Sequence, residues 1–317
     1  MTRRALILFG VMSLIWGIPY LFIRVAVAEM SPATLVFGRT AIAALVLVPI
    51  ALLRSDFRPV LARWRWVVAF AVAEVGIPWV LLGSAEQHIT SSLAGLLVAG
   101  VPLVGTVLAV ATRGRDRIHR RGIVGLLVGL AGVAAIVGSN LGVSDPTALF
   151  EMIFVVVGYA VGPAILARRL AGLPSVGVMA MAVTLCALVY APVAFVQRPT
   201  AVPSPAALFA VLVLGLVCTA AAFVLFNVLI GEIGPVRSTV ITYVNPAVAS
   251  VLGVLVLNET LTVAMVAGLV LVILGSTLAT GGAATTPEPV PEPAPEPAPE
   301  RAPEPAPGLG REPAPLP

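Results

Sequence analysis

The chain carries HITSSLAGLLVAGVPLVGTVLA at residues 88–109 and EIGPVRSTVITYVNPAVASVLG at residues 232–253. Each stretch is mostly apolar and close in length to the ~20-residue helix that crosses the hydrocarbon core of a bilayer. Pro102 and Pro246 occupy the same place in the two stretches, 144 residues apart. A kinking proline at matched positions in two apolar helices predicts that one membrane unit occurs twice in this chain.

The glycines that follow these stretches repeat in the same way. Gly125 and Gly132 are matched 143 residues later by Gly268 and Gly275. This offset is close to half of the chain before its proline-rich C-terminal segment. We therefore predict a first repeat at 1–141, a second repeat at 142–282, and a disordered cytoplasmic tail rich in proline, glutamate and alanine at 283–317.

The composition excludes a soluble protein. Hydrophobic residues make up 59% of the chain and charged residues 11%, whereas a soluble domain has about 25% charged residues. Ten apolar windows are each long enough to span a membrane: 5–23, 33–53, 66–84, 90–111, 122–139, 147–167, 177–196, 206–230, 236–257 and 262–281. The first window is longer than the 7–15-residue apolar region of a signal peptide, so we interpret it as a transmembrane helix. The sequence predicts an all-α integral membrane protein with ten transmembrane helices.

The basic residues predict the orientation of these helices. All 19 basic residues are arginine, and short loops rich in arginine remain in the cytoplasm. Fourteen of them precede the first window or fall in alternate gaps: Arg3, Arg4, Arg54, Arg58, Arg63, Arg65, Arg113, Arg115, Arg117, Arg120, Arg121, Arg168, Arg169 and Arg237. Both termini are therefore expected in the cytoplasm. Because five helices per repeat is an odd number, the second repeat enters the membrane from the opposite side, which is the inverted-repeat plan of many secondary transporters.

Four prolines inside the apolar windows are candidate helix hinges: Pro19, Pro102, Pro163 and Pro246. A proline within a transmembrane helix frees a backbone carbonyl, which neighbouring groups or cavity water can satisfy. The alternative interpretation is a set of static kinks, since proline is common in transmembrane helices.

Two ionisable residues lie deep within the apolar windows. At 1.5 Å per residue, Arg39 lies about 9 Å below the outer edge of its window and Glu74 about 12 Å above the inner edge. Charged residues at such depth are candidates for substrate or ion binding. The alternative is a structural Arg39–Glu74 pair that locks two neighbouring helices together.

Polar and aromatic residues on helix faces are further candidates for the substrate pathway: Trp16, Tyr20, Tyr159, Asn227, Tyr243 and Asn245. Such residues line cavities or pack helices together, and the sequence leaves both uses open. Cys186 and Cys218 lie inside windows and are interpreted as packing residues.

The sequence shows no motif of an enzyme or of a cofactor site. It has no phosphate-binding loop, dinucleotide fingerprint, zinc motif or Ser-His-Asp set. We therefore expect no metal, no cofactor and no catalytic residue, and energy for transport from a substrate or ion gradient. Orientation and contact with anionic lipids explain the basic charge, so nucleic acid is not an expected partner.

Three segments resemble EamA-type repeats of the drug/metabolite transporter superfamily. SLIWGIPYLFIRVA (13–26) and SPATLVFGRTAIAALVL (31–47) are similar to the opening of the first repeat, with Arg39 at the position of the arginine in the second span of the family. TYVNPAVASVLGVLVLNETLTVAMVAGLVLVILGS (242–276) is similar to the end of the second repeat. The resemblance implies that Arg39 supports the fold or a gate. Glu259 is expected to cap the last helix, since a carboxylate favours a helix N-terminus.

The resemblance implies a transporter in the bacterial cytoplasmic membrane. The expected function is secondary active transport of a small organic metabolite, amino acid-like or drug-like, by alternating access. Export is the expected direction, and protons are the candidate coupling ion. The alternative is a passive channel or a lipid-translocating protein of the same architecture.

Overall fold

The computed structural model describes residues 2–54, 57–113, 120–139, 145–234, 238 and 240–280. Every regular element within these ranges is helical, as the composition predicted. The predicted tail at 283–317 and the arginines at 115, 117 and 237 lie outside the described residues.

Eight helical segments are long and apolar enough to cross a membrane, and two shorter apolar helices follow them. The first four segments comprise α1 (Arg3–Gly17) with α2 (Pro19–Val27), then α3 (Pro32–Leu53), then α5 (Trp64–Phe70) with η1 (Ala71–Gly76) and α6 (Ile77–Ala85), then α7 (Ser91–Val98) with α8 (Val101–Arg113). The next four are α9 (Arg120–Gly138), α10 (Pro146–Arg169), α11 (Ser175–Val196), and α12 (Pro205–Gly215) with η2 (Leu216–Ala221) and α13 (Ala222–Ile233). The shorter helices are α15 (Ile241–Leu257) and α16 (Val263–Thr280), and a short helix α4 (Phe57–Leu61) precedes α5.

Polar residues set the starts of several helices. The Ser31 hydroxyl accepts from the backbone N–H of Thr34 at 3.2 Å, directly before Pro32 opens α3. The carboxylate of Asp145 does the same for Thr147 at 2.8 Å at the start of α10. These side chains satisfy backbone donors that a helix leaves unpaired in its first turn.

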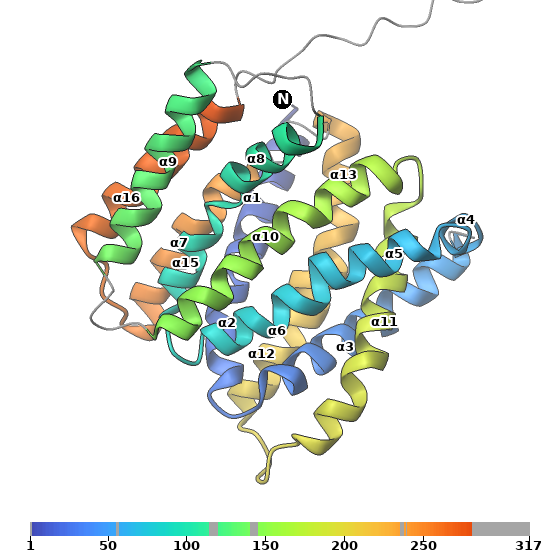
Figure 1. Cartoon of the computed structure of the whole chain (residues 1–317). Helices are drawn as coiled ribbons and strands as arrows, with labels where there is room; N and C mark the ends of the chain where they lie inside the picture. The colour runs from blue at the N-terminus through green and yellow to red at the C-terminus, as the bar shows by residue number, and fades with distance from the viewer. Residues whose placement is uncertain are drawn as a thin grey trace, which may run out of the picture. The chain divides into compact units, whose positions relative to one another are not determined.

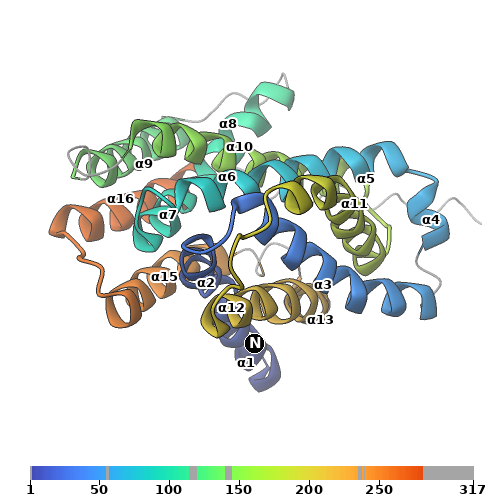
Figure 2. The ribbon, with the colours of Figure 1, turned by 90° about the horizontal axis from the view of Figure 1, so that it is seen from below.

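Helices that are distant in the sequence pack side by side. The strongest contacts join α9 to α16, α3 to α11, α6 to α10, α7 to α15, and α2 to α12. Figures 1 and 2 both show α9 beside α16 and α3 beside α11. Each of these five pairs joins a helix before residue 140 to a helix after residue 145, so the two predicted repeats are interleaved.

Hydrogen bonds also join the loops of the first predicted repeat to those of the second. The Glu29 carboxylate accepts from the backbone N–H of Ser204 at 2.6 Å and from its hydroxyl at 2.5 Å. These hydrogen bonds lower the pKa of Glu29. At the opposite ends of the helices, Arg63 donates to the carbonyl oxygens of Arg169 at 2.9 Å and Ala171 at 3.4 Å.

Helix irregularities differ between the four hinge candidates. The helix is interrupted at Ile18, before Pro19, and again between α7 and α8, before Pro102. Pro163 and Pro246 lie inside the continuous helices α10 and α15. Two helices also contain a π-helical turn, η1 and η2, a geometry that is frequent at functional sites.

Glycines allow the backbones of α9 and α16 to touch. A methyl group at Gly132 would lie 2.6 Å from the carbonyl oxygen of Gly268, and one at Gly125 would lie 2.5 Å from the backbone nitrogen of Ala279. Small residues that permit such close approach are typical of packed transmembrane helices. The glycines matched in the sequence thus meet along one interface.

We predict that Gly132→Ala lowers the stability of the protein in detergent by about 1–3 kcal/mol, because the added methyl group overpacks a backbone contact. Gly138→Ala is the matched control on the same helix, since no atom lies within 4 Å of a methyl group there. Thermal unfolding followed by circular dichroism measures both changes. Equal melting temperatures for the two variants would contradict the proposed interface.

Candidate functional site

Arg39 lies at the centre of the helices and is held by two different contacts. Its side chain is buried in the middle of α3, with 7% of the residue exposed. Its Nε donates to the Thr219 hydroxyl at 2.9 Å, and its guanidinium carbon lies 3.5 Å from the centre of the Trp79 ring. A cation so placed over an aromatic face is stabilised by the ring quadrupole. Arg39 therefore joins α3, α6 and η2.

The π-helical turn positions the acceptor for Arg39. Thr219 is fully buried in η2, and its hydroxyl donates to the carbonyl oxygen of Leu214 at 2.7 Å, five residues earlier. The same oxygen can then accept from Arg39 because a hydroxyl both donates and accepts. The local sequence thus orients the group that binds the arginine.

Two tyrosines complete this group of residues. Tyr159 packs against the buried cluster that contains Trp79, and the charge of Arg39 acts on the hydroxyls of both Tyr159 and Tyr20. We refer to Tyr20, Arg39, Trp79, Tyr159 and Thr219 as the Arg39 cluster. Three of its members come from the first predicted repeat and two from the second.

Glu74 lies beside the Arg39 cluster in η1. One of its carboxylate oxygens is buried without a hydrogen-bond partner in the described part of the chain. The carboxylate packs against Gly162 of α10, where a methyl group would lie 3.1 Å from the carboxylate carbon. Its charge acts on Tyr159, so this hydroxyl experiences both Arg39 and Glu74.

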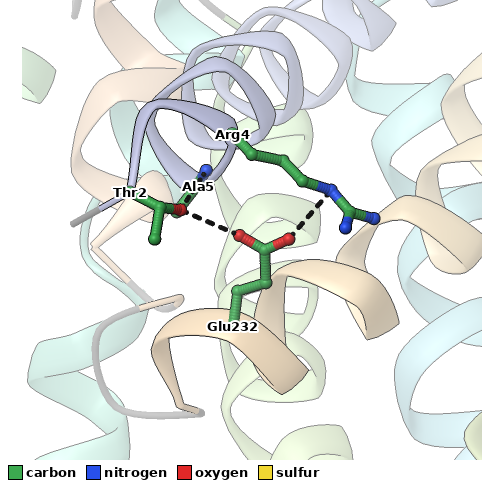
Figure 3. Close-up of polar contacts among 4 residues, drawn as sticks. All are labelled: Thr2, Arg4, Ala5 and Glu232. Carbon is green, nitrogen blue, oxygen red and sulfur yellow. Dashed lines mark hydrogen bonds and ion pairs between the residues drawn. The ribbon is translucent and has the colours of Figure 1, made fainter.

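The structural pair that the sequence allowed between Arg39 and Glu74 is absent from the described residues. Within them, the one ion pair joins Arg4 to Glu232 at 2.9 Å, and Figure 3 shows Thr2 contacting the same carboxylate. Arg39 binds Thr219 and Trp79 instead. The carboxylate of Glu74 therefore does not hold α3 in place through an ion pair with Arg39.

Trp16 and Asn227, two other pathway candidates, contact residues outside the Arg39 cluster. Trp16 packs edge-on against Phe223 and closely against Phe226, with ring centres 5.9 and 4.6 Å apart. Asn227 donates to the Phe223 carbonyl at 2.9 Å and contacts the Ser175 hydroxyl. These contacts join α1, α11 and α13.

Asn245 and Tyr243 lie on α15. The Asn245 amide lies against the carbonyl oxygens of Ser13 and Ile241, at 3.2 and 3.0 Å, and its nitrogen donates to both. This amide therefore ties α15 to α1. Tyr243 is half-buried on the same helix.

Glu259 does not cap the last helix, so that expectation was wrong. Its carboxylate accepts from the backbone N–H groups of Ser91 and Ser92 at 2.8 and 2.9 Å, and from the Ser92 hydroxyl at 2.5 Å. It therefore caps α7, and the hydroxyl of Thr262 caps α16. Gly253 makes room for this contact, because a side chain there would strike Glu259 and Ser92.

Glu86 is a buried carboxylate that the sequence did not indicate as a candidate. It has no exposed surface, and both its carboxylate oxygens are without a partner among the described residues. Burial raises its pKa, and the nearby charge of Glu259 adds to this effect. Arg24 donates to the backbone carbonyl of Glu86. Because the residue follows directly after a transmembrane helix, its position in the sequence did not indicate burial.

Comparison with known proteins identifies relatives over most of the chain. A family model described as "EamA-like transporter family" matches residues 3–138 and 147–281. Proteins named "Uncharacterized inner membrane transporter YedA" from Escherichia coli strains K12 and O157:H7 are each 29% identical over 272 residues, which is 82% of this chain and 86% of the relative. A solved structure described as "Crystal structure of protein" is 22% identical and has a TM-score of 0.63 over 89% of this chain and 98% of that chain, which shows a shared fold.

We predict that Thr219→Val destabilises the protein by about 1–3 kcal/mol, since it leaves the buried Nε of Arg39 without its acceptor. Thr184→Val is the control, because the Thr184 hydroxyl donates at 2.7 Å to Ala180 of its own helix. Thermal unfolding in detergent compares the two variants. A loss of stability in Thr184→Val as large as that in Thr219→Val would show that the Arg39 contact contributes nothing.

Proposed function

We propose that this chain, which belongs to the EamA-like transporter family, moves a small organic metabolite across the bacterial cytoplasmic membrane by alternating access. The observation that carries the proposal is the Arg39 cluster, which both predicted repeats build around a buried cation. Secondary transporters with inverted repeats bind substrate near the midplane between the repeats. The relatives described as inner membrane transporters support the location in the cytoplasmic membrane.

We infer that the two repeats are related by inversion. With the helical spans counted in chain order, α2 of the first span packs on α12 of the eighth, and α10 of the sixth span packs on α6 of the third. These two contacts exchange when each span is replaced by the span five places away. The π-helical turns lie in the third and eighth spans, which this exchange also pairs. Pro19 and Pro163 are 144 residues apart, like Pro102 and Pro246.

The paired prolines support a movement of one repeat relative to the other. The helices of the first repeat break before Pro19 and Pro102, whereas Pro163 and Pro246 lie in continuous helices. A carrier in any one state has its two repeats in different conformations, and exchange of those conformations opens the other side. These four prolines are therefore the proposed hinges.

The orientation that we propose places both termini in the cytoplasm. Arg63, Arg168 and Arg169 then face the cytoplasm, and the Glu29–Ser204 contact faces outward. This orientation follows the arginine distribution in the sequence.

The chemistry of the cluster favours a small substrate with an anionic group. The Nε of Arg39 is bound by Thr219, while its two terminal nitrogens have no hydrogen-bond acceptor among the described residues. Those nitrogens form the planar edge that binds carboxylates. The aromatic groups of Tyr20 and Tyr159 supply apolar surface beside it, which suits an amino acid-like or drug-like metabolite.

Glu74 is the proposed proton site of the transport cycle. It is a carboxylate near the centre of a span, and it has a buried, unpartnered oxygen. Protonation would remove the charge whose burial is costly, and Tyr159 would sense the change because both Glu74 and Arg39 act on it. In this proposal, protons that move inward by way of Glu74 drive the export of the metabolite. Trp16, Asn227, Tyr243 and Asn245 are proposed to lie along the pathway away from the cluster.

The alternative is a passive channel or a lipid-translocating protein built on the same helices. Proteoliposomes loaded with candidate metabolites distinguish them. A carrier gives saturable counterflow of labelled substrate, and a pore gives none.

We predict that Glu74→Gln abolishes the stimulation of transport by a pH gradient and leaves counterflow intact, because glutamine preserves the shape of the side chain but does not bind a proton. Glu151→Gln is the matched control, since Glu151 already accepts from the Ser84 hydroxyl at 2.8 Å. A pH-sensitive dye inside the proteoliposomes reports proton movement. Unchanged pH dependence in Glu74→Gln would refute the proton role of this residue.

A further inference from the structure

A pocket rich in arginine and tryptophan lies where α10 ends and α5 begins. Its volume is about 520 Å³. The charged and aromatic residues that line it are Arg63, Arg65, Arg168, Arg169, Trp64 and Trp66. None of the residues lining the pocket is acidic.

No ion pair to these arginines occurs within the part of the chain that the structure describes, and three of the four are held by other contacts. Arg63 is fixed by its bonds to the carbonyl oxygens of Arg169 and Ala171. The guanidinium carbon of Arg169 lies 4.5 Å from the centre of the Trp66 ring, and that of Arg65 lies 5.7 Å from the centre of the Trp64 ring. Contacts to carbonyls and aromatic rings orient these cations but leave their charge in place. Four such charges around one hollow attract an anion.

The surroundings of the pocket distinguish a lipid from a soluble anion. Trp64 and Trp66 are 52% and 40% exposed at the start of a membrane-spanning segment, which is where tryptophan meets the headgroup region of a bilayer. Leu61, beside them, is 54% exposed. A soluble anion would leave these apolar surfaces in water, whereas a phospholipid covers them with its glycerol and acyl groups.

We propose that this pocket binds the phosphate headgroup of an anionic phospholipid from the leaflet that meets these helix ends. Guanidinium groups bind phosphate oxygens through paired N–H donors. Basic pockets between transmembrane helices are suited to anionic headgroups. The proposal does not depend on the identity of the transported metabolite.

A lipid in this pocket bridges two segments that lead to the Arg39 cluster. α5 continues directly into η1, which carries Glu74, and α10 carries Tyr159 and Gly162. The bound headgroup neutralises arginines on both segments and so holds their ends together. Occupancy of the pocket therefore links the lipid composition of the membrane to the region of the transport site.

The test is native mass spectrometry of the full chain in detergent, titrated with dioleoyl phosphatidylglycerol or dioleoyl phosphatidylcholine. We expect tighter binding of the phosphatidylglycerol. The double variant Arg65→Gln/Arg168→Gln should weaken that binding by roughly tenfold or more, because each basic group near an anionic headgroup contributes separately. Neither residue donates a hydrogen bond to the backbone among the described contacts, so both can be replaced without removing the Arg63 contacts.

Arg120→Gln/Arg121→Gln is the matched control, since it removes the same charge from the exposed start of α9, outside the pocket. It should change phosphatidylglycerol binding by less than about twofold. Equal weakening in the two double variants would overturn the proposal, because it would show diffuse attraction to basic helix ends. Equal binding of phosphatidylcholine would also overturn it, as would displacement of the lipid by inorganic phosphate at equimolar concentration, which would point to a soluble anion.

Discussion

The buried charge of Arg39 is the constraint on which the centre of this protein depends. A cation within a transmembrane helix is costly unless protein groups replace its water. Thr219 and Trp79 supply a hydrogen bond and an aromatic face, and they come from different predicted repeats. Arg39 can be buried only if the helices that carry these residues meet at one place. The interleaving of the two repeats brings these helices together and so supplies the groups that stabilise the charge.

The backbone imposes a second constraint, since no water satisfies its polar groups in the hydrocarbon core. The chain meets it with continuous helices and with π-helical turns where the helix must widen. One such turn places Thr219 beneath Arg39, and the other places Glu74 against Gly162. Both irregular turns therefore lie at the Arg39 cluster, whereas the glycine-lined contact of α9 with α16 is regular. The helices away from the cluster are packed for stability, and those at the cluster are shaped around polar side chains.

The sequence was sufficient for the membrane class, the helices and the family, because each depends on composition, length and local motifs. It also indicated Arg39, Glu74, Tyr20 and Tyr159, since polar groups are conspicuous in apolar helices. It could not indicate Trp79 or Thr219 as partners of Arg39, because both lie on helices distant from Arg39 in the sequence. The cap made by Glu259 was assigned to the wrong helix for the same reason: α16 is near in sequence, but α7 is near in space.

In alternating access, the Arg39 cluster opens to one side of the membrane at a time. Tyr159→Cys, in a protein whose two native cysteines are replaced by alanine, places one thiol at the cluster. Its rate of reaction with a membrane-impermeant maleimide is measured from each side of oriented vesicles while a pH gradient or a transported metabolite is varied. We expect the rate of reaction to rise on one side of the membrane as it falls on the other. Reactivity that changes in the same direction on both sides, or that is confined to one side under all conditions, would contradict it.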